Sequence, residues 1–246
     1  MYKTMTKVLI LFMFSLSALA SVGPGYEDKL LKSFKVVYQD KRQFSKLKEE
    51  VLTSAGKAVP VLIKVMKSSD YPMESRWAAT FLLGQITGKQ GIPFIAKFSK
   101  HPDWVMRTAS LKTLLALNER ERTDVYTNAL IDESLIVRTQ ALENVSSLKL
   151  TKLGPHVWSM LFRKENYYHT KKGLRRSEIV NRVIRTLGEI KYEKAQAPML
   201  AMINNNKYDD IFSDLDYSLS LITGKSSPKG DISVKRVFWK QLIKKT

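Results

Sequence analysis

An arginine recurs in this chain at a constant interval of 31 residues, and this repeat constrains the fold more than any other feature. Arg76, Arg107 and Arg138 each begin a stretch with an aliphatic residue seven positions later and another ten positions later. Those residues are Leu83, Leu114 and Val145, then Ile86, Leu117 and Leu148. A period of this length is typical of arrays in which each unit is a small supersecondary structure that packs on its neighbours.

Prolines support the same period. Pro93 and Pro155 stand two periods apart, and Pro60 and Pro198 open similar apolar runs. Because proline is tolerated in the first turn of a helix, each one indicates the start of a first helix. Polar turn residues precede each arginine stretch, at 68–70, 101–103 and 131–134. Each unit is therefore predicted to be a short helix, a polar turn and a second helix that carries the arginine.

The spacing within these units resembles that of a known family. Asp70 lies six residues before Arg76, and Asp132 lies six residues before Arg138. The middle unit departs from the pattern, with His101 in the aspartate position and Asp103 two residues later. This pattern is similar to short HEAT-like repeats of the phycobilisome-lyase type, in an exported bacterial member. Ankyrin and tetratricopeptide signatures do not recur.

The resemblance implies an all-α fold, a right-handed superhelical solenoid of antiparallel helix pairs with a period of about 31 residues. It also implies that the periodic carboxylates and arginines form a ladder between adjacent units, with a structural role. The second helices of such arrays form a concave surface, and most of these arrays are scaffolds that bind other proteins.

The first twenty residues are predicted to be a signal peptide. Lys3 and Lys7 precede the apolar run at 8–14, and Ala18-Leu19-Ala20 provides the small residues of a cleavage site before Ser21. The run is too short for a membrane anchor, so we expect no stable membrane insertion. The alternative is a buried N-terminal helix. Cleavage near Ala20-Ser21 predicts a periplasmic or secreted protein, which without cysteine has no disulfide.

The remaining residues divide into three parts. Residues 21–55 are expected to form N-terminal capping helices, 56–224 the HEAT-like repeats, and 225–246 a C-terminal capping helix. In the last part, one helical face is predicted to carry the capping contacts. That face contains Val234, Val237, Phe238 and Leu242.

The period breaks between Pro155 and Pro198, where 12 extra residues fall within 163–176. This insertion holds six basic residues, one acidic residue, Tyr167, Tyr168 and His169. Insertions into repeats often map to the binding face, so we expect a recognition loop here. The alternative is a solvated loop that only lengthens two helices. The predicted binding residues are Tyr167, Tyr168, Lys171, Lys172, Arg175 and Arg176, followed by Lys112, Arg182 and Arg185 on the concave helices.

No catalytic, cofactor or metal motif is visible in the sequence, so we expect a binding protein and not an enzyme. The three histidines, His101, His156 and His169, do not pair at metal-ligand spacing. The acidic residues at 209–216 are the best candidate for a metal, but a capping or solvated role fits them better because the pattern lacks the glycine of a calcium loop. A lyase activity, which the family name suggests, has no cysteine or other evident nucleophile to support it.

The formal net charge of +18 favours an acidic partner. The leading hypothesis is an exported scaffold that binds an acidic protein through its concave face and the basic insertion. The alternative is a binder of an anionic polymer, either nucleic acid or an acidic cell-wall glycan. The oligomeric state stays open.

Overall fold

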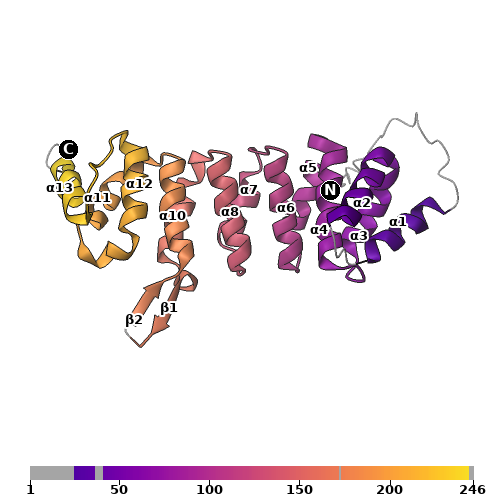
Figure 1. Cartoon of the computed structure of the whole chain (residues 1–246), viewed down its shortest axis with the longest axis horizontal. Coiled ribbons are helices and arrows are strands. Elements are labelled where there is room, and N and C mark those ends of the chain that lie inside the picture. The colour runs from indigo at the N-terminus through magenta and orange to yellow at the C-terminus, as the bar shows by residue number, and fades with distance from the viewer. Residues whose placement is uncertain (1–24, 37–40, 172, 244–246) are drawn as a thin grey trace, which may run out of the picture.

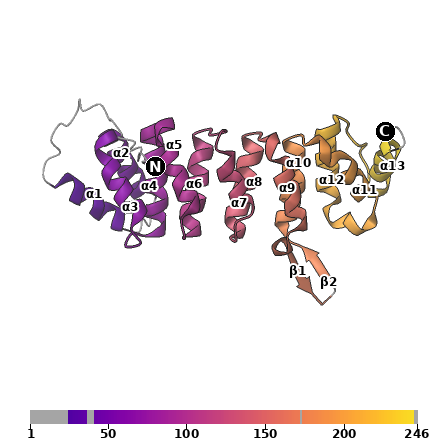
Figure 2. The ribbon, with the colours of Figure 1, turned by 180° about the vertical axis from the view of Figure 1, so that it is seen from behind.

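Stacked helices account for nearly all of the structure. The computed structural model describes residues 25–36, 41–171 and 173–243, and within them the helices follow one another in sequence order along one elongated row (Figures 1 and 2). This arrangement confirms the predicted all-α class. The expected signal peptide lies outside the described residues.

The row consists mainly of helix pairs. The first helices of the pairs are α3 (Val59–Lys67), α5 (Ile92–Lys97), α7 (Thr123–Leu130), α9 (Gly154–Ser159) and α11 (Gln196–Ile203). The second helices are α4 (Met73–Thr87), α6 (Trp104–Ala116), α8 (Leu135–Ser147), α10 (Glu178–Glu189) and α12 (Phe212–Thr223). Each first helix packs against the second helix that follows it, and each second helix packs against the next one.

The helix boundaries confirm the period. Helices α4, α6 and α8 begin at Met73, Trp104 and Leu135, which are 31 residues apart. The next second helix begins 43 residues later, at Glu178, because the insertion intervenes. Proline is the second residue of α3, α5 and α9, and Pro198 is the third residue of α11, so all four prolines lie in a first turn as predicted.

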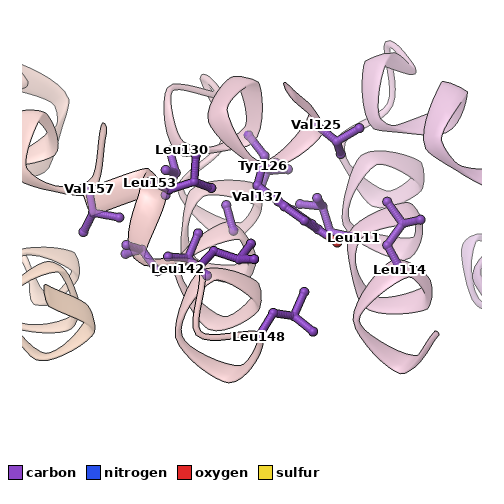
Figure 3. Packing of buried hydrophobic residues seen from close by; sticks show 14 of the residues in the cluster. Leu111, Leu114, Val125, Tyr126, Leu130, Val137, Leu142, Leu148, Leu153 and Val157 are labelled. Carbon is purple, nitrogen blue, oxygen red and sulfur yellow. The ribbon is translucent and has the colours of Figure 1, made fainter. Parts of the chain in front are cut away.

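A continuous apolar core joins the pairs. In the middle of the row, Leu111 and Leu114 of α6 lie beside Val125 and Tyr126 of α7, and the same packing continues through α8 to α9 (Figure 3). The second helices are apolar around much of their circumference, so each one needs neighbours on more than one side. A single pair could not bury its apolar surface alone, and stacking on the neighbouring pairs supplies the missing cover.

Arginines and carboxylates link consecutive pairs. Arg76 Nη1 donates to Asp103 Oδ2 at 2.7 Å, and Arg107 Nε and Nη2 donate to Asp132 Oδ2 and Oδ1 at 2.8 Å each. These contacts form two rungs of the predicted ladder. Asp132 binds Arg138 through its backbone and not through its carboxylate, since Arg138 Nη1 donates to the Asp132 carbonyl.

His101 explains why the middle unit tolerates a change in the pattern. Its backbone carbonyl accepts from Arg107 Nη1 at 3.0 Å, which any residue can do, and Asp103 provides the carboxylate of that turn. Burial, followed by the charge of Arg76, lowers the pKa of His101. The neutral ring can therefore accept the backbone N–H of Asp103 through Nδ1, at 3.0 Å.

Further helices lie at the two ends of the row. At the N-terminal end, α1 (Tyr26–Lys35) and α2 (Lys41–Ser54) bury Leu30, Phe34 and Val51 against the first pair. At the other end lies α13 (Ile232–Ile243), where the predicted apolar face is wrong in part. Val234 and Val237 are exposed, and among the residues of this helix whose burial is described, Trp239 is the fully buried one. The helix turns this way because the Trp239 indole N–H donates to Asp216 Oδ1 at 2.7 Å.

Residues of the insertion form a β-hairpin, where the sequence predicted a loop or lengthened helices. Strand β1 (Tyr167–Thr170) pairs antiparallel with β2 (Gly173–Arg176), and the hairpin projects from the row beside α9 and α10 (Figures 1 and 2). None of the helices in the described part of the chain combines the length and hydropathy needed to cross a membrane.

Candidate functional site

Local sequence explains why the insertion forms strands. Tyr167, Tyr168 and Thr170 are residue types that favour extended backbone, and Gly173 takes a φ of 106° at the start of the returning strand. Tyr167 pairs with Arg176, and Tyr168 pairs with Arg175. The tyrosines of β1 are therefore paired with the arginines of β2 in a defined register.

Hydrogen bonds fix the base of the hairpin to the row. The Ser177 backbone N–H donates to the Asn166 carbonyl at 3.1 Å, which closes the base. The Tyr167 hydroxyl donates to the Leu161 carbonyl at 2.5 Å. A phenol is protonated at neutral pH, and burial raises the pKa of Tyr167 further, so this bond is kept into the alkaline range.

Arg176 ties the hairpin to the following pair. Its Nη1 donates to both carboxylate oxygens of Asp210, at 2.8 and 3.0 Å. Its guanidinium also lies over the Tyr208 ring, 4.7 Å from the centroid. These contacts neutralise Arg176 and hold the hairpin in place, so Arg176 is an anchor of the site.

A groove of about 830 Å³ opens at the base of the hairpin. Its apolar lining includes Trp158 and Phe162, which precede the hairpin, and Pro198 and Met202 of α11. Phe162 is 73% exposed and lies edge-on to Trp158, with the ring centroids 6.3 Å apart. Contiguous apolar surface that is left exposed to water is a feature of binding surfaces, and Phe162 and Trp158 contribute such surface to this groove.

The rim of the groove is basic. Arg175 of β2 and Lys207, which precedes α12, are both exposed at the rim, and each lacks an ion pair among the described residues. The hairpin tip adds the exposed Lys171. Apolar surface framed by positive charge suits a partner segment that combines apolar and acidic side chains.

The structure separates the predicted binding residues into two groups. Tyr167, Arg175 and Arg176 line the groove, while Tyr168 and Lys171 lie further out on the hairpin with their side chains exposed. Lys172 lies outside the described residues. The described members of this group lie on the hairpin.

Lys112, Arg182 and Arg185 belong to the second helices and do not line the groove. Each one bridges two neighbouring helices. Arg182 pairs with Glu143 of α8 at 2.6 Å, Arg185 pairs with Asp214 of α12 at 3.2 Å, and Lys112 lies 5.8 Å from the Trp77 ring centroid. Their contacts give all three a structural use.

The acidic cluster is occupied by internal partners. Asp210 pairs with Arg176, Asp214 with Arg185, Asp209 with Arg236, and Asp216 with Lys235. In the described ranges, no group of three or more histidine, cysteine or carboxylate side chains is placed to hold a metal ion.

Sequence reasoning missed Trp158, Phe162 and Lys207. The sequence did contain a signal for Trp158 and Phe162. They stand four residues apart directly before the insertion, a spacing that brings two side chains together on one face of a helix. Lys207 carried no signal, since only the fold brings it to the hairpin. Comparison with protein-family models finds no match, and comparison with curated proteins finds none either.

Proposed function

We propose that this chain is an exported HEAT-like scaffold that binds an acidic protein partner at the hairpin and its groove. The observation that carries the proposal is the exposed Phe162 at a groove with a basic rim. Burying one such aromatic side chain contributes about 1.5–3 kcal/mol, which is enough for an anchor residue.

The wider features of the chain support the same class. The constant period and the stacked pairs fit a right-handed HEAT-like solenoid, in which each unit is fixed by its neighbours and surface insertions are free to serve binding. The sequence of the first twenty residues supports export to the periplasm or the medium. N-terminal sequencing of the mature protein should then begin at Ser21.

The first experiment shortens the hairpin without removing its anchors. Tyr167 and Arg176 face each other across the strands, so an Asn-Gly turn can join them directly in place of residues 168–175. The shortened protein keeps the Tyr167 and Arg176 contacts with the row and should retain its helical content and melting temperature. Its capture of partner from an envelope fraction should fall sharply.

A second variant tests the groove itself. Phe162→Ala removes the exposed ring and should shorten the lifetime of the complex with little effect on folding. Val237→Ala is the matched control, since it truncates a comparably exposed apolar residue at the end of the row. If the protein with the shortened hairpin and Phe162→Ala both captured the partner at wild-type levels, the proposed site would be contradicted.

An anionic polymer is the second candidate, favoured by the basic residues of the hairpin. The two candidates differ in their response to salt. When binding is driven by phosphates, the logarithm of the binding constant falls steeply and linearly with the logarithm of the salt concentration. Binding anchored by Phe162 should keep most of its affinity as salt rises. Titration of the purified protein against duplex DNA and against an isolated protein partner, over a range of salt, separates them.

A further inference from the structure

Arg138 differs from the other ladder arginines in one respect. Arg107 uses Nη1 to bind the carbonyls six and five residues before it, and uses Nε and Nη2 to bind Asp132. Arg138 also binds the carbonyls six and five residues before it, at 2.8 and 2.9 Å. Its Nε, however, has no hydrogen-bond partner, and no carboxylate bonds to its side chain within the described residues. Arg76 Nε is also without a partner, but Arg76 has Asp103.

The sequence explains the difference. The turn before α6 supplies Asp103 to Arg76, and the turn before α8 supplies Asp132 to Arg107. Asp103 stands directly before its helix, and Ser177 has that place before α10. Asp132 stands three residues before the first residue of α8. Arg175 stands three residues before the first residue of α10. The unit with the hairpin thus has a serine and an arginine at the two places where its predecessors have a carboxylate.

The surroundings of Arg138 favour an anion. The residue is only 2% exposed, and the neighbouring Arg163 also has a buried Nε without a hydrogen bond. Burial, followed by the charge of Arg163, lowers the pKa of Arg138. Glu165 is the nearby carboxylate, with Oε2 3.6 Å from Arg163 Nε and a side chain that is 56% exposed. Arg138 is thus a buried guanidinium group without a close carboxylate, and a buried charge of this kind is stabilised when a carboxylate binds it.

We propose that Arg138 and Arg163 together bind a carboxylate side chain of the acidic partner segment, in the manner that Arg107 binds Asp132. This inference rests on the proposed function and names the chemistry recognised beside the hairpin. Arg163 lies four residues before the start of β1, so the site adjoins the base of the hairpin. Glu165, being exposed, swings aside as the partner carboxylate enters. The planar guanidinium fork selects a carboxylate by two parallel hydrogen bonds.

The test supplies the missing carboxylate from within. Ser177→Asp places an aspartate where Asp103 stands in its own unit, so it should bind Arg138. Because the change also removes the Ser177 hydroxyl that donates to the Asn166 carbonyl, its melting temperature is compared with that of Ser177→Asn and should be about 2–4 °C higher. Affinity for an all-glutamate peptide, measured by fluorescence anisotropy, should fall about tenfold or more because the site is filled. Ser177→Asn is the uncharged control, and the exposed Lys164→Gln has the same change in net charge beside the site; both should lose no more than a fewfold.

Glu165→Gln removes the internal competitor and should strengthen peptide binding, whereas Glu133→Gln, an equal charge change next to Arg107, should not. Unchanged peptide affinity in Ser177→Asp would overturn the inference. A second outcome would also overturn it. If inorganic phosphate raised the melting temperature of the wild type while Ser177→Asp kept its peptide affinity, the site would bind a free anion and not the partner carboxylate. If Ser177→Asp retains the partner but the shortened hairpin does not, the proposed function stands and only the carboxylate site is refuted.

Discussion

Replacing Asp132 with alanine is expected to destabilise the chain by about 3–5 kcal/mol, the usual cost of removing one partner from a buried ion pair. Arg107 and Asp132 are 8% and 12% exposed, and their two hydrogen bonds are both 2.8 Å long. After the change, Arg107 keeps two backbone carbonyls and Glu133 at 3.3 Å. Glu133 is largely exposed, so it offsets only a small part of the loss.

A second contact at Asp132 adds to the cost. Its Oδ1 also accepts the backbone N–H of Ser134 at 2.8 Å, directly before α8, and loss of such a contact at a helix start typically costs about 1 kcal/mol. The range of about 3–5 kcal/mol for breaking a buried ion pair already includes part of this contact, so the expected loss of stability stays within it. Urea unfolding followed by far-ultraviolet circular dichroism measures the change, and an unaltered slope shows that cooperativity is retained.

The matched control is Asp124→Ala. Arg122 and Asp124 form the same two-bond geometry, both at 3.0 Å, but their side chains are 38% and 57% exposed. Water screens this pair, so its loss should cost less than about 1 kcal/mol. The double variant Arg107→Met with Asp132→Leu removes both charges and should recover most of the lost stability. Equal, small losses for Asp132→Ala and Asp124→Ala would refute the argument that burial makes the ladder matter.

Two further predictions concern packing and pH. Gly188→Ala places a Cβ 2.5 Å from the Ser218 backbone Cα, so crowding of α10 against α12 should outweigh the gain in helix propensity and cost about 1–3 kcal/mol in urea unfolding. Gly56→Ala, which meets no atom within 4 Å, should be neutral or slightly stabilising, and a neutral Gly188→Ala would contradict the close approach. Burial alone would raise the pKa of Asp216, but hydrogen bonds from Lys235, Ser227 and Trp239 lower it. The stability from this lowered pKa is present above the unfolded value of about 3.9 and is lost as the pH falls through the folded value. Fluorescence of Trp239, isolated by comparison with Trp239→Phe, should therefore report release of α13 below about pH 4 in the wild type. We expect α13 to be released at that acidic pH in the wild type and already at neutral pH in Asp216→Asn. If the fluorescence of Asp216→Asn depended on pH as that of the wild type does, the role of the carboxylate would be refuted.

The periodic part of the fold could be read from the sequence, because each repeat needs the same residue types at the same places. Arg76, Arg107 and Arg138 marked the second helices since each is the fourth residue of its helix. The hairpin could not be placed in the same way. Its strands are four residues long, too short for alternation of side chains to distinguish them from a loop.

The candidate site was predictable only where its residues are adjacent in the chain. The sequence indicated Tyr167, Arg175 and Arg176 because they lie within one break in the period. The groove also needs Met202 and Lys207, which approach the hairpin only through the packing of the following pair. The C-terminal face was wrong for a related reason, since the partner that orients Trp239 is Asp216, more than twenty residues earlier.

The closed base of the hairpin has a consequence for engineering. Because Asn166 and Ser177 are joined by a hydrogen bond, the chain leaves the row and returns to it at nearly the same point. Helices α8 and α10 pack together across this departure as their counterparts do elsewhere. The position is therefore a natural graft point: a foreign hairpin or a peptide epitope whose ends meet could be inserted there and displayed beside a rigid helical rod without altering the register of the stack.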